Sequence, residues 1–130
     1  MKFEHFAINV EDPLEMAEWY VKHLGLKVVR TMKTSPFMTF LADDSGTIML
    51  EIYNNPKGQI LDFKSLHPLS VHLALVSSDP AEDKNRLLQQ GATLLSDDIL
   101  DDGSHLVMLR DPWGLAIQFC KRATPMLKAH

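Results

Sequence analysis

The stretch FEHFAINVEDP at residues 3–13 has a counterpart in the second half of the chain, SVHLALVSSDP at residues 70–80. Both read as an apolar β-strand that carries one histidine and leads to an Asp-Pro pair, and a shift of 67 positions places His5 on His72. The same shift aligns the two Asp-Pro pairs and lays a late glutamate on a glutamine. Six histidines can align by accident, so the additional matches are what indicate an internal repeat.

Each repeat is expected to fold as a βαβββ module. In both, the Asp-Pro pair supplies a helix N-cap and a proline suited to the first helical turn. The expected elements of the first module are strand 3–10, a helix to about residue 23 closed by Gly25, and strands 26–32, 37–41 and 47–53. Those of the second are strand 70–76, a helix from 79–80 to Gly91, and strands 93–99, 105–110 and 115–120.

The predicted fold class is α+β, with two tandem βαβββ modules forming a curved mixed-sheet cup and the helices on its outer face. We expect one domain over residues 1–130, with module one at about 3–53, a linker at 54–69 and module two at about 70–121.

Composition narrows the classes of function. A net charge of −4 provides no basic stripe for nucleic acid, and no segment is apolar and long enough to be a membrane span or a signal peptide. The single cysteine, Cys120, excludes an intrachain disulfide and suits a reducing compartment. We therefore expect a cytoplasmic protein that uses neither nucleic acid nor a membrane as a partner.

Strand alternation places the polar residues of the repeat on one side of each sheet. One side of the relevant strands is bulky and aliphatic, whereas the other carries His5, Glu51, His72 and Gln118 beside smaller neighbours. If the two sheets curve about a pseudo-twofold axis, these four side chains point at one centre. Two imidazoles, a carboxylate and an amide oxygen suit Zn²⁺, Ni²⁺, Co²⁺, Fe²⁺ or Mn²⁺. Taken singly, each histidine is better explained as a hydrogen-bonded polar residue on a pocket wall, and it is the repeat-related set of four that favours a metal site.

These motifs resemble the vicinal oxygen chelate superfamily, which includes glyoxalase I, bleomycin and fosfomycin resistance proteins, extradiol dioxygenases and methylmalonyl-CoA epimerase. The resemblance covers roughly residues 3–121. It rests on the histidine in the first strand, LEIYNN around Glu51, VHLAL at His72 and RDPWGLAIQF through Gln118.

The resemblance implies that a divalent metal ion, held by His5, Glu51, His72 and Gln118, acts as a Lewis acid on a substrate that chelates it through neighbouring oxygens. Most members carry a glutamate where this chain has Gln118. In glyoxalase I that carboxylate abstracts the substrate proton, which an amide cannot do at neutral pH. Glu51 is therefore the expected proton acceptor and catalytic residue.

Further residues are expected to contact a substrate. The resemblance points to Asn9, which stands where glyoxalase I has an arginine for glutathione, and to Asn55. Phe37, Met49 and Tyr53 are either an apolar substrate wall or core residues. His105 is either an acid or base facing the cavity or an exposed edge-strand histidine.

The resulting expectation is a glyoxalase-like, metal-dependent enzyme with lyase or isomerase chemistry on a small oxygen-rich metabolite. The alternative is a binding protein without turnover that sequesters a drug or metabolite, as bleomycin resistance proteins do. Because exposed strand edges of such modules commonly pair between chains, we expect a homodimer.

Overall fold

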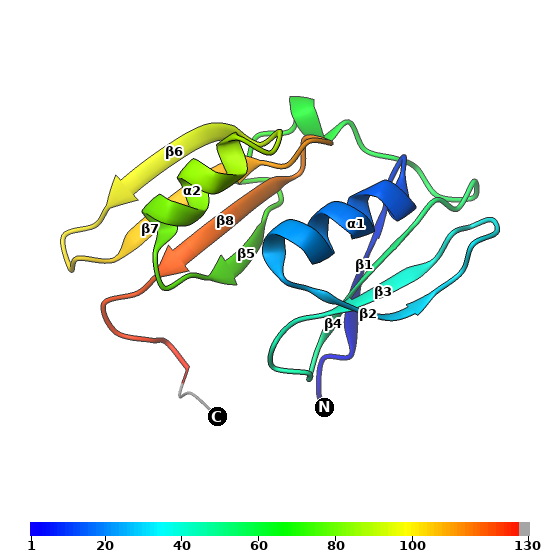
Figure 1. Cartoon of the computed structure of the whole chain (residues 1–130), viewed down its shortest axis with the longest axis horizontal. Helices are drawn as coiled ribbons and strands as arrows, with labels where there is room; N and C mark the ends of the chain where they lie inside the picture. Colours follow the sequence, from blue (N-terminus) through cyan, green and yellow to red (C-terminus); the bar gives the residue numbers. More distant parts are fainter. Residues whose placement is uncertain (128–130) are drawn as a thin grey trace. The chain divides into compact units, whose positions relative to one another are not determined.

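The computed structural model describes residues 1–127, and these form two compact units that divide between Leu61 and Asp62. The division falls inside the segment predicted to be a linker. Each unit contains one α-helix and one four-stranded sheet (Figure 1). None of the helices in the described residues is long and apolar enough to cross a lipid bilayer.

The first unit has the predicted βαβββ order. Its elements are β1 (His5–Asn9), α1 (Pro13–Leu24), β2 (Lys27–Thr31), β3 (Thr39–Ala42) and β4 (Met49–Tyr53). The strands lie in the order β1-β4-β3-β2, with β1 parallel to β4 and the other neighbours antiparallel.

The second unit repeats this arrangement after a short 3₁₀ helix. Its elements are η1 (Phe63–Ser65), β5 (Leu73–Val76), α2 (Pro80–Leu88), β6 (Thr93–Ile99), β7 (His105–Arg110) and β8 (Ala116–Lys121). The strands lie in the order β5-β8-β7-β6, and β5 is parallel to β8. The same topology in both units confirms the tandem βαβββ fold of the α+β class.

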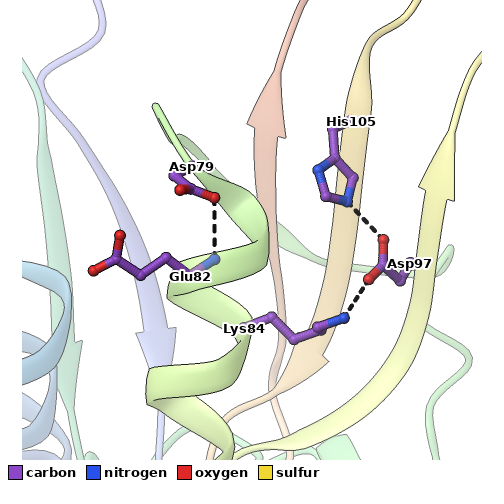
Figure 2. Close-up of polar contacts among 5 residues, drawn as sticks. All are labelled: Asp79, Glu82, Lys84, Asp97 and His105. Carbon is purple, nitrogen blue, oxygen red and sulfur yellow. Dashed lines mark hydrogen bonds and ion pairs between the residues drawn. The ribbon is translucent and has the colours of Figure 1, made fainter.

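Both helices begin where the Asp-Pro pairs predict. The Oδ1 atom of Asp12 accepts the backbone N–H of Glu15 at 3.4 Å, and that of Asp79 accepts the N–H of Glu82 at 3.1 Å (Figure 2). These side chains each satisfy a backbone donor that the first helical turn leaves without a partner. Helix α1 ends at Gly25, which has a φ of +74°.

The core of the first unit lies between α1 and one face of its sheet. Helix α1 packs against β2, β3 and β4, where Leu41 and Ile52 are at most 1% exposed. The buried residues of the helix are Pro13, Met16, Ala17 and Tyr20, which follow the i, i+3, i+4, i+7 spacing of one helical face. Val21 lies outside this face and is 37% exposed.

The second half of the predicted linker belongs to the second unit. The Arg110 guanidinium donates from Nη1 to the carbonyl oxygens of Phe63 (2.9 Å) and Gly114 (3.0 Å), and from Nη2 to that of Leu66 (2.8 Å). One side chain thus binds three carbonyl groups and attaches η1 to the turn between β7 and β8.

Strand β5 starts later than the sequence predicts. Residues 67–70 form a turn, in which the backbone N–H of Ser70 donates to the carbonyl of His67 at 2.8 Å and that of Leu69 donates to His67 Nδ1 at 3.1 Å. The strand therefore begins at Leu73, and His72 lies immediately before it.

Candidate functional site

His5 and Glu51 lie on the face of the first sheet that α1 does not cover. In the parallel pairing of β1 with β4, His5 is opposite Met49 and Ala7 is opposite Glu51. Because residues two apart in a strand share a face, both polar side chains project to the same side. The alternate residues of β4 are buried in the core, with Ile52 at 0% exposure.

The two side chains meet. His5 Nε2 lies 3.4 Å from Glu51 Oε1, and the exposed fractions of the side chains are 36% and 14%. The other ring nitrogen, Nδ1, is 2.7 Å from Glu4 Oε1, and the ring stands edge-on to Phe40 with centroids 5.5 Å apart. Since a carboxylate only accepts hydrogen bonds, Nδ1 carries the proton, and in the neutral ring the Nε2 lone pair is directed toward Glu51.

This pair has the chemistry and spacing of metal ligands. A neutral imidazole nitrogen and a carboxylate oxygen both bind Zn²⁺ and similar ions. Two such atoms about 2.1 Å from an ion at the tetrahedral angle are about 3.4 Å apart, which equals the observed separation. A carboxylate on the far ring nitrogen is also the usual outer partner of a metal-binding histidine.

In the second unit, Gln118 lies in β8 and His72 lies just before β5, the strand that pairs with β8. Gln118 in β8 is opposite Ala74 in β5, and His72 precedes Ala74 by two residues. The Nδ1 atom of His72 donates to the carbonyl of Pro68 at 2.9 Å, so its Nε2 also carries the lone pair in the neutral ring. Gln118 Oε1 accepts the Cys120 thiol at 3.4 Å.

The predicted quartet is thus divided between the units, two residues in each. His5 and Glu51 are brought together, and no interaction joins His72 to Gln118 among residues 62–127. Within the described part of the chain, no three His, Cys, Asp or Glu side chains are grouped closely enough to hold a metal ion. The four-residue site remains a prediction.

Asn9 and Asn55, predicted to contact a substrate, bind each other. Asn9 Oδ1 accepts the backbone N–H of Asn55 at 2.7 Å, and Asn9 Nδ2 donates to the carbonyls of Asn55 (3.0 Å) and Gln59 (3.4 Å). A Cβ atom on Gly58 would lie 3.0 Å from Asn9 Nδ2, so the loop fits closely around this amide. The amide of Asn9 therefore holds the loop that follows β4.

The three residues predicted as an apolar wall have different positions. Met49 and Tyr53 lie half-buried on the Glu51 face of β4. Phe37 lies in the loop before β3, half-buried, with a φ of +58°, which is rare for an aromatic residue. Met49 is the one of the three that lines a cavity of about 280 Å³ in the first unit.

Some residues that line this cavity were not predicted from the sequence. It is lined by Glu4, Val29, Arg30, Phe40 and Met49. The pairing of β2 with β3 shifts register between Val28 and Arg30, so simple alternation does not assign Arg30 to the Glu51 face. Only the paired sheet shows that Arg30 shares this face.

His105 lies on the opposite side of the second sheet from Gln118. Its cross-strand partner in β6 is Ile99, whereas Gln118 pairs with Met108. His105 Nε2 donates to Asp97 at 2.6 Å, and Lys84 of α2 donates to the other oxygen of Asp97 at 2.5 Å (Figure 2). These hydrogen bonds, first from Lys84 and then from His105, lower the pKa of Asp97. The structure thus gives His105 a hydrogen bond to Asp97 beside α2.

A second cavity, of about 400 Å³, lies in the second unit beside the end of β5. Its apolar lining includes Ala74, Val76, Cys120, Met126 and Leu127. Residues 126 and 127, which follow β8, therefore form part of the wall. Burial raises the pKa of the Cys120 thiol, which disfavours a nucleophilic role at neutral pH.

Three solved structures illustrate the proteins whose fold this chain shares. TnmS3, an antibiotic binding protein from Streptomyces sp. CB03234, is 19% identical with a TM-score of 0.69, over 92% of this chain and 93% of that one. SMU.1112c is 25% identical with a TM-score of 0.70, over 93% and 98%. A glyoxalase I mutant from Zea mays is 18% identical with a TM-score of 0.72, over 95% of this chain and 46% of that one.

A sequence match to a protein family extends over nearly the whole fold. No curated protein matches the chain. The model of the Glyoxalase/Bleomycin resistance protein/Dioxygenase superfamily, however, matches residues 2–119, which include both βαβββ units. The chain belongs to the Glyoxalase/Bleomycin resistance protein/Dioxygenase superfamily.

Proposed function

We propose that this protein is a metal-dependent enzyme that performs lyase or isomerase chemistry on a small oxygen-rich metabolite. In this proposal His5, Glu51, His72 and Gln118 hold one divalent ion, which is Zn²⁺, Ni²⁺, Co²⁺, Fe²⁺ or Mn²⁺. Membership of a superfamily that includes glyoxalases supports the proposal.

The observation that carries the proposal is the His5–Glu51 pair. His5 Nδ1 is hydrogen-bonded to Glu4, and His5 Nε2 lies 3.4 Å from the Glu51 carboxylate. Two acceptors that face each other at this distance repel unless a proton or a cation lies between them. A divalent ion satisfies both atoms at once.

The residues themselves supply binding and proton transfer. A bound ion would supply Lewis acidity, which stabilises negative charge on a substrate oxygen. Gln118 contributes an amide oxygen that cannot take up a proton at neutral pH. Glu51 is the acidic member of the set, and its Oε2 has no hydrogen-bond partner among residues 1–127. We assign to Glu51 the acceptance of the substrate proton.

Metal titration of purified protein tests the proposal. We expect stoichiometric binding of Zn²⁺ or Ni²⁺, which His5→Ala and Glu51→Gln weaken by at least ~10-fold, since even loss of an outer hydrogen-bond partner costs that much. His23→Ala, a histidine on α1, is the matched control and should bind as the wild type does. Absence of metal binding would refute the proposal.

Turnover is then measured with methylglyoxal and a thiol. Formation of a thioester that disappears in Glu51→Gln supports the assigned chemistry. Stoichiometric metal without turnover would indicate that the substrate is a different oxygen-rich metabolite.

A second candidate is sequestration of a small molecule without turnover. It is favoured by the apolar cavity of about 400 Å³ in the second unit, whose lining has no charged residue other than Lys121 and Arg122. Binding of an apolar fluorescent dye by metal-free protein, lost in Ala74→Trp, supports sequestration. Dye binding that requires metal would oppose it.

We further propose that the protein is a cytoplasmic homodimer. Each open sheet has two edge strands, which are β1 and β2 in the first unit and β5 and β6 in the second. Such edges are commonly covered by pairing. The one cysteine, Cys120, forms no disulfide, which suits a reducing compartment. Sedimentation equilibrium tests the dimer.

A further inference from the structure

We propose that Arg30 binds an anionic group of the substrate and so selects metabolites that carry a carboxylate at the end opposite their metal-chelating oxygens. This inference rests on the proposed function, because it assumes that those oxygens lie at His5 and Glu51. It uses only residues of the first unit.

The register of the sheet places Arg30 in line with Glu51. Arg30 of β2 is opposite Phe40 of β3, and Phe40 is opposite Glu51 of β4. Cross-strand partners share a face, so the three side chains form one row across the sheet. Neighbouring strands are about 4.8 Å apart, which separates the Arg30 and Glu51 backbones by roughly 10 Å. A small metabolite can span this distance.

The space along this row is a cavity with an apolar floor. Arg30, Phe40 and Met49 all line the volume of about 280 Å³. Phe40 also contacts the edge of the His5 ring. The cavity thus joins the guanidinium to the aromatic ring that contacts His5, the histidine paired with Glu51. An apolar middle portion of a substrate fits this floor.

Arg30 is the cation of this cavity that has no acidic partner. No ion pair or hydrogen bond engages its side chain among residues 1–127, whereas the acid that lines the same cavity, Glu4, is bonded to His5 Nδ1 at 2.7 Å. A guanidinium presents donors in a planar fork that matches the two oxygens of a carboxylate. The side chain is exposed, so such a ligand can reach it.

Two nearly isosteric ligands distinguish the effect of ligand charge on affinity from the effect of ligand shape. In 3,4-dihydroxybenzoate two vicinal oxygens, an aromatic ring and a carboxylate are arranged in a line, and 3,4-dihydroxybenzamide replaces the carboxylate with a neutral amide. We expect Zn²⁺-loaded wild-type protein to bind the benzoate about tenfold more tightly by calorimetry, the ratio that corresponds to ~1.4 kcal/mol. Equal affinities would overturn the inference.

Two variants locate the preference. Arg30→Gln should bind both probes with equal affinity and still bind Zn²⁺. Lys27→Gln is the matched control, because Lys27 pairs with Ala42 on the same face and its loss changes the net charge equally, but it does not line the cavity. Lys27→Gln should keep the tenfold preference. A preference that survives in Arg30→Gln, or that disappears in Lys27→Gln, would overturn the assignment to Arg30.

Failure of the proposed function can be distinguished from failure of this inference. If the protein binds no Zn²⁺, the proposed function fails, and the anion site is tested on metal-free protein by following the arginine Nε–H signals in NMR spectra. If 3,4-dihydroxybenzoate shifts the Arg30 signal and 3,4-dihydroxybenzamide does not, the anion site is supported independently of metal binding. Absence of that shift would overturn it.

Discussion

Replacing Gly114 with alanine tests how the segment leading to His72 is attached to the second sheet. Gly114 has a φ of +99°, and an added Cβ would lie 2.9 Å from the backbone nitrogen of Lys64 in η1. Because this contact is with a backbone atom of Lys64, rotating the Lys64 side chain cannot relieve the clash. Either η1 moves or the turn between β7 and β8 distorts.

The expected loss of stability has two parts. An L-residue at this φ costs ~1–2 kcal/mol, and forcing extra volume into a packed contact costs ~1–3 kcal/mol. We therefore expect Gly114→Ala to lower the free energy of unfolding by ~2–5 kcal/mol. The substitution also disturbs the backbone carbonyl of residue 114, which accepts a hydrogen bond from Arg110 at 3.0 Å.

Gly103 offers a matched control within the same unit. Its φ is +90°, but a Cβ there would meet nothing within 4 Å. Gly103→Ala therefore carries the backbone cost of ~1–2 kcal/mol alone. The effect of alanine on the unfolded chain is common to both variants and cancels in the comparison.

Urea unfolding followed by circular dichroism measures both variants. Gly114→Ala should be less stable than Gly103→Ala by at least ~1 kcal/mol. It should also weaken metal binding, because η1 leads through the turn at residues 67–70 to His72. Equal stabilities would mean that Lys64 does not pack on Gly114, and the attachment of this segment would be wrong.

Three further predictions concern individual side chains. Gln118→Glu restores a carboxylate at the late-strand position and should raise the methylglyoxal-plus-thiol activity; unchanged activity with the metal still bound would contradict a glyoxalase-like geometry. Asp97→Asn should cost ~1 kcal/mol at pH 7 in urea unfolding, because the carboxylate is paired with Lys84 and His105. The lowered pKa of Asp97 means that this stabilisation is present above the unfolded value of about 3.9 and is lost as pH falls through the folded value, so variant and wild type should converge in acid. An equal difference at pH 7 and in acid would oppose this assignment. Cys120 has a pKa raised by burial, so native protein at pH 7 should react with iodoacetamide much more slowly than urea-unfolded protein, and equal rates would contradict the burial.

Local chemistry made a large part of the fold predictable. An Asp side chain caps the nearest N–H groups and a proline suits the first helical turn, so the starts of α1 and α2 follow from the Asp-Pro pairs. Strand alternation likewise assigned His5 and Glu51 to one face before any pairing was known. These effects act within a few residues, which is why the sequence reveals them.

Other features depend on which strands become neighbours. The shift between Val28 and Arg30 turns Arg30 to the Glu51 face, and it exists only because β2 pairs with β3. His105 faces α2 because β6 brings Asp97 within 2.6 Å of its ring. Both contacts depend on the register of a strand pair, which the alternation along a single strand does not reveal.

The sequence by itself determined the repeated βαβββ order, the helix starts and the face that carries His5 and Glu51, because capping and alternation are short-range effects. Only the tertiary structure decided that His5 Nε2 lies 3.4 Å from Glu51, that Asn9 is occupied by the loop after β4, and that Arg30 lines a cavity in the same row. These contacts join residues that are distant in the chain, and their geometry comes from strand register and packing rather than from local preference.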